Sequence, residues 1–152
     1  MKPWMLTALG ALAGAAAGFA VLPIARGADG LIVSNTTLAR PPELVSPEAK
    51  EAGGLSGRPL FTMSTRMLAR AYLRCEGAIG LIGCGGVEDA ETALAKIEAG
   101  AQLLQIYTGF VYRGPGVVDK ILRGICSAIE TRGLDGVAAL VGGKAREFAV
   151  ET

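Results

Sequence analysis

The chain has 152 residues, a formal net charge of +1 and no histidine. A near-neutral chain offers no electrostatic reason to expect a nucleic-acid partner, and the missing histidines exclude His-based catalytic triads and His-ligated metal sites. Its three cysteines lack the paired spacing of a zinc site or a redox motif. We therefore predict no metal site, and we expect reduced thiols as in a cytoplasmic protein.

The first 22 residues differ in kind from the rest of the chain. Trp4 to Leu22 carries no charge and is long enough to cross a hydrocarbon core of ~30 Å. Gly10, Gly14 and Gly18 fall on one helical face, which is the small-residue seam of transmembrane helix pairs. A basic start before an apolar run also fits a secretory signal, and an Ala/Gly-rich run can arise from a truncated or out-of-frame upstream reading. Residues 1–22 are thus predicted to be a separate, helix-like apolar segment, and these three origins stay open.

From Ala28 onward, apolar strand runs alternate with amphipathic helix patterns. The predicted strands are Leu31–Val33, Ile79–Ile82 and Leu103–Ile106. The helix patterns end near Gly77, Gly100 and Gly133, and a weaker helical tail follows to Phe148. This order implies parallel strands joined by crossover helices. Since closure of the usual barrel needs eight strands, we predict an α/β fold consisting of the last three βα units of a partial TIM barrel.

Polar or glycine-rich loops follow all three predicted strands. Ser34 to Thr37 comes after the first strand, Gly85-Gly86 after the second and Tyr107-Thr108 after the third. Backbone N–H groups from the last two loops could reach one anion, which is how a barrel holds a phosphorylated cofactor. Each loop also has a purely structural alternative. Ser34 to Thr37 could be a helix cap or polar turn, Gly85-Gly86 could be a plain turn, and Tyr107 could be a core aromatic residue. Pro41 to Gly57 is predicted to be a long irregular loop, and such loops are usually functional or disordered.

Five stretches of the chain stand out in their order and spacing: DGLIVSNTT (29–37), GGLSGRPL (53–60), LIGCGGV (81–87), AKIEAGAQLLQIYTG (95–109) and VYRGP (111–115). Together they resemble the C-terminal part of dihydroorotate dehydrogenase. The YTG and YRGP elements fit the quinone-dependent, membrane-associated class 2 branch of that family. The resemblance runs from about Val21 to the C-terminus, so residues 23–152 would be the C-terminal part of an FMN-binding β/α barrel.

The resemblance implies a flavoprotein oxidoreductase of pyrimidine (UMP) biosynthesis. Such an enzyme oxidises dihydroorotate to orotate through FMN and passes the electrons to quinone. Two positions match family contacts to the pyrimidine substrate: Asn35 and Thr36. Six positions match family contacts to FMN: Ser34, Gly57, Gly85, Gly86, Tyr107 and Thr108.

In the family, a serine on an earlier loop acts as catalytic base, and a lysine and asparagines from earlier strands also hold the flavin. None of these has a counterpart in this sequence, so we assign no catalytic residue and expect little activity from the chain alone. A complementing N-terminal fragment is one expected partner. The alternatives are a non-catalytic flavin or phosphate-binding module, and a membrane-anchored barrel remnant. The resemblance and the apolar start together lead us to expect membrane association on the cytoplasmic side.

Overall fold

The structure is a computed structural model, which describes residues 6–7, 27–42 and 44–150. Its centre is a parallel sheet in which the strand order follows the chain order. This confirms the parallel α/β arrangement expected from the alternating pattern. The strands are β1 (Leu6–Thr7), β2 (Gly30–Val33), β3 (Gly80–Cys84) and β4 (Leu103–Gln105).

The short strand β1 is not predicted by the sequence. It lies inside the segment expected to be helix-like, and it pairs in parallel with β2, so that Leu6 lies opposite Leu31. The helix-like prediction is therefore wrong for Leu6 and Thr7, whose backbone groups hydrogen-bond along the edge of β2. The rest of this segment, with its glycine seam, lies outside the described residues.

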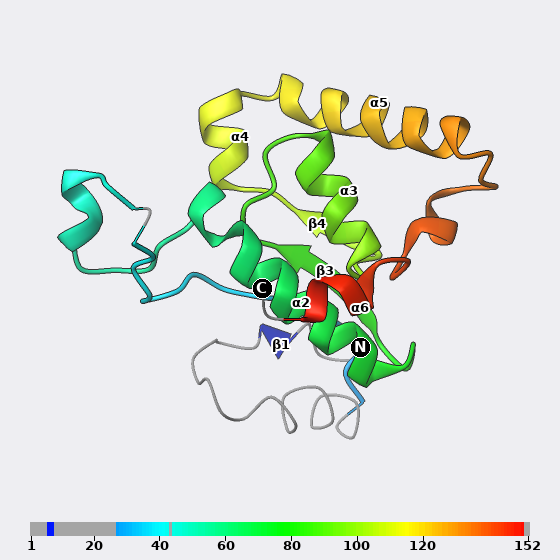
Figure 1. The fold of residues 1–152 in the computed structure, drawn as a ribbon, viewed down its shortest axis with the longest axis horizontal. Helices are drawn as coiled ribbons and strands as arrows, with labels where there is room; N and C mark the ends of the chain where they lie inside the picture. Colours follow the sequence, from blue (N-terminus) through cyan, green and yellow to red (C-terminus); the bar gives the residue numbers. More distant parts are fainter. Residues whose placement is uncertain (1–5, 8–26, 43, 151–152) are drawn as a thin grey trace.

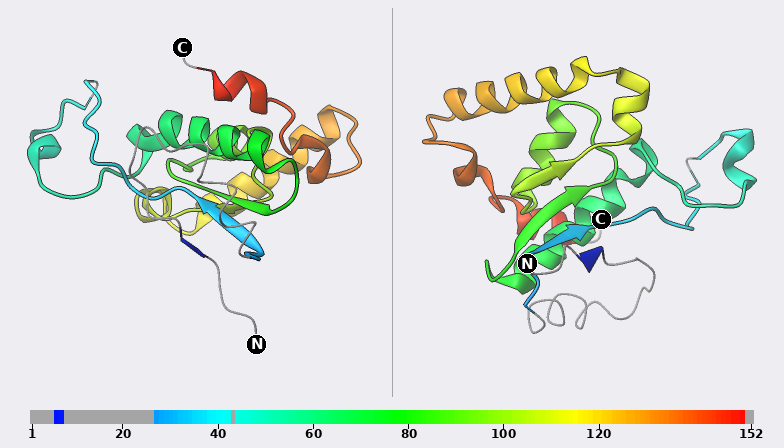
Figure 2. Two further views of the ribbon diagram at one scale, coloured as in Figure 1. Left: turned by 90° about the horizontal axis from the view of Figure 1, so that it is seen from below. Right: turned by 180° about the vertical axis from the view of Figure 1, so that it is seen from behind.

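Helices follow β2, β3 and β4 and cover the sheet. Helix α2 packs against β2 and β3, and α6 packs on the outer side of α2, while α5 lies along α3 (Figures 1 and 2). The α-helices are α2 (Phe61–Cys75), α3 (Ala90–Glu98), α4 (Thr108–Arg113), α5 (Gly116–Thr131) and α6 (Ala145–Ala149). The described residues also form three short 3-10 helices: η1 (Pro47–Lys50), η2 (Arg58–Leu60) and η3 (Val137–Leu140).

The helix ends follow local sequence signals. Helix α2 ends where Glu76 adopts a left-handed backbone angle, φ 47°. Helix α3 begins with a capping box, in which the Asp89 carboxylate accepts from the Thr92 N–H at 2.8 Å and the Thr92 hydroxyl accepts from the Asp89 N–H. Helix α4 is an element that the sequence pattern does not predict, and it ends at Gly114, φ 72°.

Two apolar clusters hold the layers together. The larger one lies between the sheet and α2, where Leu31, Leu68 and Leu81 are at most 1% exposed. The smaller one lies under α3 and α5 and contains Ala93 and Ile121. Burial of apolar surface at about 25 cal/mol per Å² makes these contacts the main source of stability. They fix α2 and α3 relative to the ends of β3 and β4, where the candidate site lies.

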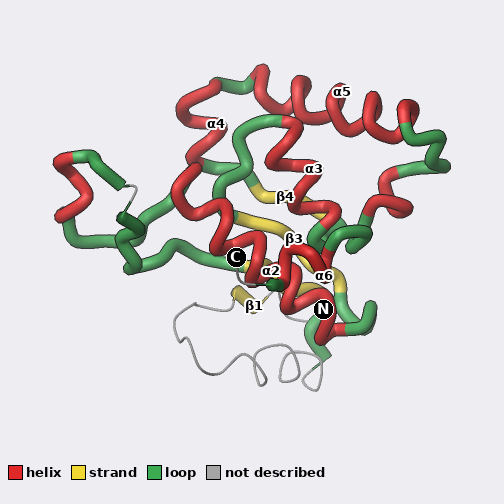
Figure 3. The backbone as a smooth tube through the Cα atoms, viewed as in Figure 1, coloured by secondary structure: helices red, strands yellow, loops and turns green. Residues whose placement is uncertain are grey.

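A long loop leaves the body between β2 and η2, as the left side of Figure 3 shows. Its two arms are joined by backbone hydrogen bonds between Thr37 and Leu55, at 2.7 and 3.2 Å. The irregular loop expected over 41–57 is therefore present, apart from η1. Of the helices in the described part of the chain, none combines the length and apolarity needed to span a bilayer.

Candidate functional site

A cavity of about 560 Å³ lies at the carboxyl ends of β3 and β4. Three of the six positions predicted to contact FMN meet there: Gly57, Gly86 and Thr108. Because parallel strands end at one edge of a sheet, loops distant in sequence converge at this edge. The Thr108 hydroxyl contacts that of Ser56 at 3.1 Å, and this contact joins the loop after β4 to the loop before η2.

Gly57 and Gly86 are both buried, and both have backbone angles that favour glycine, with φ of 76° and 77°. A Cβ atom on Gly86 would lie 2.5 Å from the Cβ and 2.6 Å from the Cα of Phe61. A Cβ atom on Gly57 would lie 2.9 Å from the Thr108 Cγ2. Only glycine at these two positions lets the loop backbones pack this closely beside the cavity.

The cavity lining carries more positive than negative charge. Arg58 and Arg113 both line it, together with Glu88. The Glu88 carboxylate accepts from Arg58 at 2.7 Å and from Arg113 at 3.4 Å, so a single carboxylate is shared by two guanidinium groups. Asp89, which does not line the cavity, also lies 3.8 Å from Arg58, so the two guanidinium groups face two carboxylates. What the arginines offer an anionic ligand is their N–H donors at the cavity wall. The sequence prediction missed both arginines, although Arg58 directly follows Gly57.

The other predicted cofactor positions lie outside the cavity lining. Gly85 forms the turn after β3 with φ 95°, and its carbonyl oxygen faces the Ser64 hydroxyl at 3.0 Å. Tyr107 precedes α4, and 78% of its surface is exposed. Ser34 is half-buried at the end of β2. The structure thus places these three residues near the same sheet edge without bringing their side chains together.

The two predicted substrate contacts, Asn35 and Thr36, are both exposed and lie just after β2. The Asn35 side-chain oxygen accepts from the Thr36 N–H at 2.7 Å, so the amide is partly used within its own loop. Thr36 packs against Gly54, which lines the cavity. This places the predicted substrate loop beside the predicted cofactor cavity.

A buried lysine lies behind the loop that follows β3. Lys96 is fully buried, and its ammonium donates to the Ser64 hydroxyl at 2.6 Å and to the Cys84 carbonyl at 3.2 Å. Burial lowers the pKa of Lys96 to about 7, and coupling to Cys84 offsets only part of this effect. Burial likewise raises the pKa of the Cys84 thiol, against smaller opposing effects of Lys96 and the Gly85 N–H. The sequence offers one signal for this burial: Lys96 directly precedes Ile97, and both residues lie on the buried side of α3.

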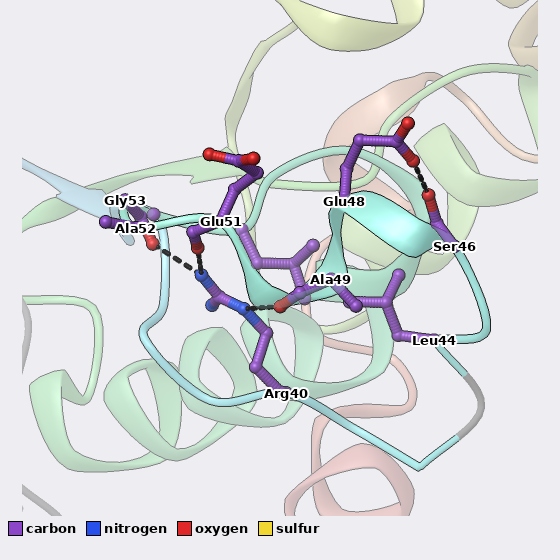
Figure 4. A pocket seen from close by; sticks show the side chains of 10 residues that line it. Arg40, Leu44, Ser46, Glu48, Ala49, Glu51, Ala52 and Gly53 are labelled. Carbon is purple, nitrogen blue, oxygen red and sulfur yellow. Dashed lines mark hydrogen bonds between the residues drawn. The ribbon is translucent and has the colours of Figure 1, made fainter.

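A second hollow, of about 240 Å³, lies within the long loop around Arg40 (Figure 4). The Arg40 guanidinium donates to the carbonyl oxygens of Ala49, Glu51 and Gly53 at 2.8 to 2.9 Å. These bonds fold the loop around the arginine. The hollow is therefore explained as loop structure, and the charged cavity at the sheet edge is the stronger candidate for a ligand site.

The residues around the larger cavity fit a phosphorylated cofactor. A phosphate group needs donors and positive charge, and the lining offers two guanidinium groups, a threonine hydroxyl and glycine backbone without obstructing side chains. The position at the carboxyl ends of the last two strands is where barrels hold phosphate. The fold defines a segment of a β/α barrel, and the cavity is its candidate site for a phosphorylated ligand.

Comparison with known sequences identifies the family within that class. The sequence model described as dihydroorotate dehydrogenase matches residues 16–129. A protein named dihydroorotate dehydrogenase (quinone) from Bradyrhizobium sp. (strain BTAi1 / ATCC BAA-1182) is 50% identical over 127 residues, which are 83% of this chain. One of the same name from Brucella ovis is 53% identical over 122 residues, or 80% of this chain. The chain belongs to the dihydroorotate dehydrogenase family, as the five motifs predicted.

Solved structures support the fold assignment. The ligand-free enzyme from Eimeria tenella superposes with a TM-score of 0.83 at 35% identity, over 90% of this chain and 38% of that one. The ferulenol complex of the same enzyme gives 0.79 at 37% identity, over 84% and 34%. These neighbours are TIM barrels, which confirms the partial-barrel prediction. The chain spans about a third of the length of its curated relatives, 35% and 33% for the two named above.

Proposed function

We propose that this chain forms the C-terminal, FMN phosphate-binding part of a quinone-dependent dihydroorotate dehydrogenase acting in pyrimidine (UMP) biosynthesis. The observation that carries the proposal is the meeting of Gly57, Gly86 and Thr108 at one cavity that two arginines also line. Each of the three matches an FMN contact by family resemblance. The family resemblance supplies FMN as the ligand, and the donors that line the cavity support an anionic group at this position.

In this proposal, the chain's own residues bind and orient rather than perform chemistry. FMN, when bound, accepts the hydride that leaves dihydroorotate. The backbone at Gly86 and the hydroxyl of Thr108 hold the phosphate end of the cofactor, with Gly85, Tyr107 and Ser34 as further contacts.

Asn35 and Thr36 orient the pyrimidine ring, because a planar ring with alternating donors and acceptors suits an amide and a hydroxyl. We assign no proton transfer to any residue of this chain. Removing a positioned base typically costs ~10²- to 10⁴-fold in rate, so the catalytic base must come from elsewhere in an active assembly. Quinone as acceptor, membrane association on the cytoplasmic side and a complementing N-terminal fragment belong to the same proposal.

The test is reduction of flavin by substrate. The purified chain, loaded with FMN, is mixed with a separately produced N-terminal portion of a close relative, and dihydroorotate is added without oxygen. The proposal is supported if dihydroorotate bleaches the flavin absorbance with the wild-type chain and this bleaching is lost with the Asn35→Ala variant. Asn35→Asp is the more conservative variant for comparison. Retained FMN without bleaching in any mixture would contradict the proposal and leave a non-catalytic flavin-binding module.

A further inference from the structure

Lys96 is a buried cation that the proposed function leaves without a role. Its side chain crosses from α3 to the back of the turn at Cys84 to Gly86, where it bonds to the Cys84 carbonyl and the Ser64 hydroxyl. Ser64 is itself only 1% exposed and lies on α2. The ammonium also lies 5.5 Å from the centre of the Phe61 ring, the residue that packs against Gly86. Three elements thus converge on one charged group directly behind the turn.

These bonds determine which way the turn presents its backbone. The Ser64 hydroxyl lies 3.0 Å from the Gly85 carbonyl oxygen and 3.0 Å from the Phe61 carbonyl oxygen, so these two acceptors share its single proton. The Gly85 carbonyl therefore faces the buried side of the turn. In a planar trans peptide, the carbonyl and the following N–H point in opposite directions. The Gly86 N–H therefore points away from Ser64, and Gly86 is the residue of this turn that lines the cavity.

We propose that Lys96 is a positioning residue that, through Ser64 and the Cys84 carbonyl, aims the Gly86 N–H at a phosphate group and supplies positive charge behind it. The proposal rests on the proposed function for the identity of the anion. The distances and burial above carry it. A hydrogen-bonded cation held behind a turn stabilises an anion in front of it without touching it, because the buried surroundings screen charge weakly.

The buried position makes the Lys96 charge responsive to the anion. Burial has already lowered the pKa of Lys96 to about 7, so near neutral pH the free protein holds both protonation states. An anion bound at Gly86 favours the protonated form and raises the pKa of Lys96. By linkage, anion binding takes up a proton and therefore weakens as pH rises above about 7.

Other ionisable groups near this site leave that pH window free. The Cys84 thiol faces Lys96 from β3, and its pKa is raised above the ordinary thiol value, so it stays neutral below about pH 8.5. Arg58, Arg113 and Glu88 face the cavity from the other side of the turn. Asp89 adjoins Arg58 on that side. Burial raises the pKa of Asp89, but hydrogen bonds from Thr92 and the charges of Arg58 and Arg113 outweigh burial, so the net pKa is lowered and Asp89 stays ionised in this window.

Inorganic sulfate is the probe, because its own charge is constant over this range while that of phosphate is not. The Gly86 amide resonance is followed by NMR during sulfate titration of the whole chain at several pH values. If bound sulfate raises the pKa of Lys96 by about one pH unit, linkage weakens binding about 7-fold between about pH 6 and about pH 8.5. A sulfate affinity that does not change with pH would refute the coupling between the anion and the Lys96 charge, whether or not any variant folds.

Lys96→Met and Ser64→Ala are the variants, and Lys120→Met is the matched control, because Lys120 is exposed on α5. Lys96→Met is expected to bind sulfate about 10-fold more weakly and without the pH dependence, while Lys120→Met matches the wild type. Ser64→Ala is expected to weaken binding while keeping part of the pH dependence, because the Cys84 bond remains. Lys96→Met binding sulfate like Lys120→Met would refute the role of Lys96.

The outcomes for FMN separate the two proposals. If the wild-type chain and the Lys96→Met variant retain FMN equally well, the proposed function stands and the role of Lys96 is overturned. A pH-dependent sulfate response at Gly86 without FMN retention supports the role of Lys96 and contradicts the flavin assignment. If sulfate leaves the Gly86 resonance unchanged, the turn does not hold an anion and the inference falls in either case.

Discussion

Gly86→Ala is the substitution with the clearest structural consequence. The residue has φ 77°, which costs an L-residue about 1–2 kcal/mol. The new Cβ would also lie 2.5 Å from the Phe61 Cβ and 2.6 Å from its Cα, so the start of α2 must move. Overpacking of this kind typically costs about 1–3 kcal/mol. The expected total loss in the free energy of unfolding is therefore about 2–5 kcal/mol.

Gly133→Ala is the matched control. Gly133 has φ 61°, but a Cβ there would meet no atom within 4 Å, so only the backbone cost of about 1–2 kcal/mol applies. Urea unfolding followed by circular dichroism measures both variants against the wild type. FMN titration by fluorescence quenching then measures the cavity directly, and only Gly86→Ala is expected to lose flavin affinity. Equal stability and equal flavin affinity in the two variants would refute the close approach at Gly86.

Two further predictions concern the contacts that hold α3. Burial raises the pKa of Glu98, but hydrogen bonds from Arg132 at 2.6 Å and Lys144 at 2.9 Å outweigh this, and the net pKa is lowered. The ionised Glu98 carboxylate thus stabilises the fold at pH values above its ordinary pKa, and this stabilisation is lost as the pH falls through the lowered pKa. In the Glu98→Gln variant, the free energy of unfolding is therefore expected to fall less steeply as the pH is lowered. Gly100→Ala would place a Cβ 2.3 Å from the Tyr72 Cγ, and it is expected to cost about 3 kcal/mol or more in thermal or urea unfolding.

Each of these two predictions has an outcome that contradicts it. Unchanged acid sensitivity in Glu98→Gln would mean that the buried ion pairs add no pH-dependent stability. For Gly100→Ala the control is Gly77→Ala, because Gly77 has φ 80° and open space around its Cβ direction. Similar losses in both would show that the Tyr72 ring moves aside without cost.

The positions of the main strands and helices could be predicted from short-range patterns. Apolar runs at Leu31–Val33 and Ile79–Ile82 mark β2 and β3, because both strands are covered by helices and need apolar side chains. Strand β1 could not be predicted in this way. Its pairing with β2 is a long-range backbone contact, and the side-chain pattern around Leu6 carries no trace of it.

The site was predictable in part for the same reason. Gly86 and Thr108 each follow a strand, so the parallel topology brings them to one edge without further information. Lys96 was missed because a lysine inside a helix ordinarily marks a solvent-facing position. Its burial depends on Ser64, 32 positions earlier in the chain, which is a tertiary contact. The substrate roles of Asn35 and Thr36 stay predictions.

The most direct test of the central claim compares FMN with riboflavin, which differ only in the phosphate. The purified chain is mixed with each flavin, excess is removed by gel filtration, and the absorbance spectrum is recorded. We expect FMN to be retained and riboflavin to be lost, because the cavity at Gly57, Gly86 and Thr108 is proposed to bind the phosphate end. Loss of both flavins, or equal retention of the two, would contradict FMN binding through its phosphate in this chain.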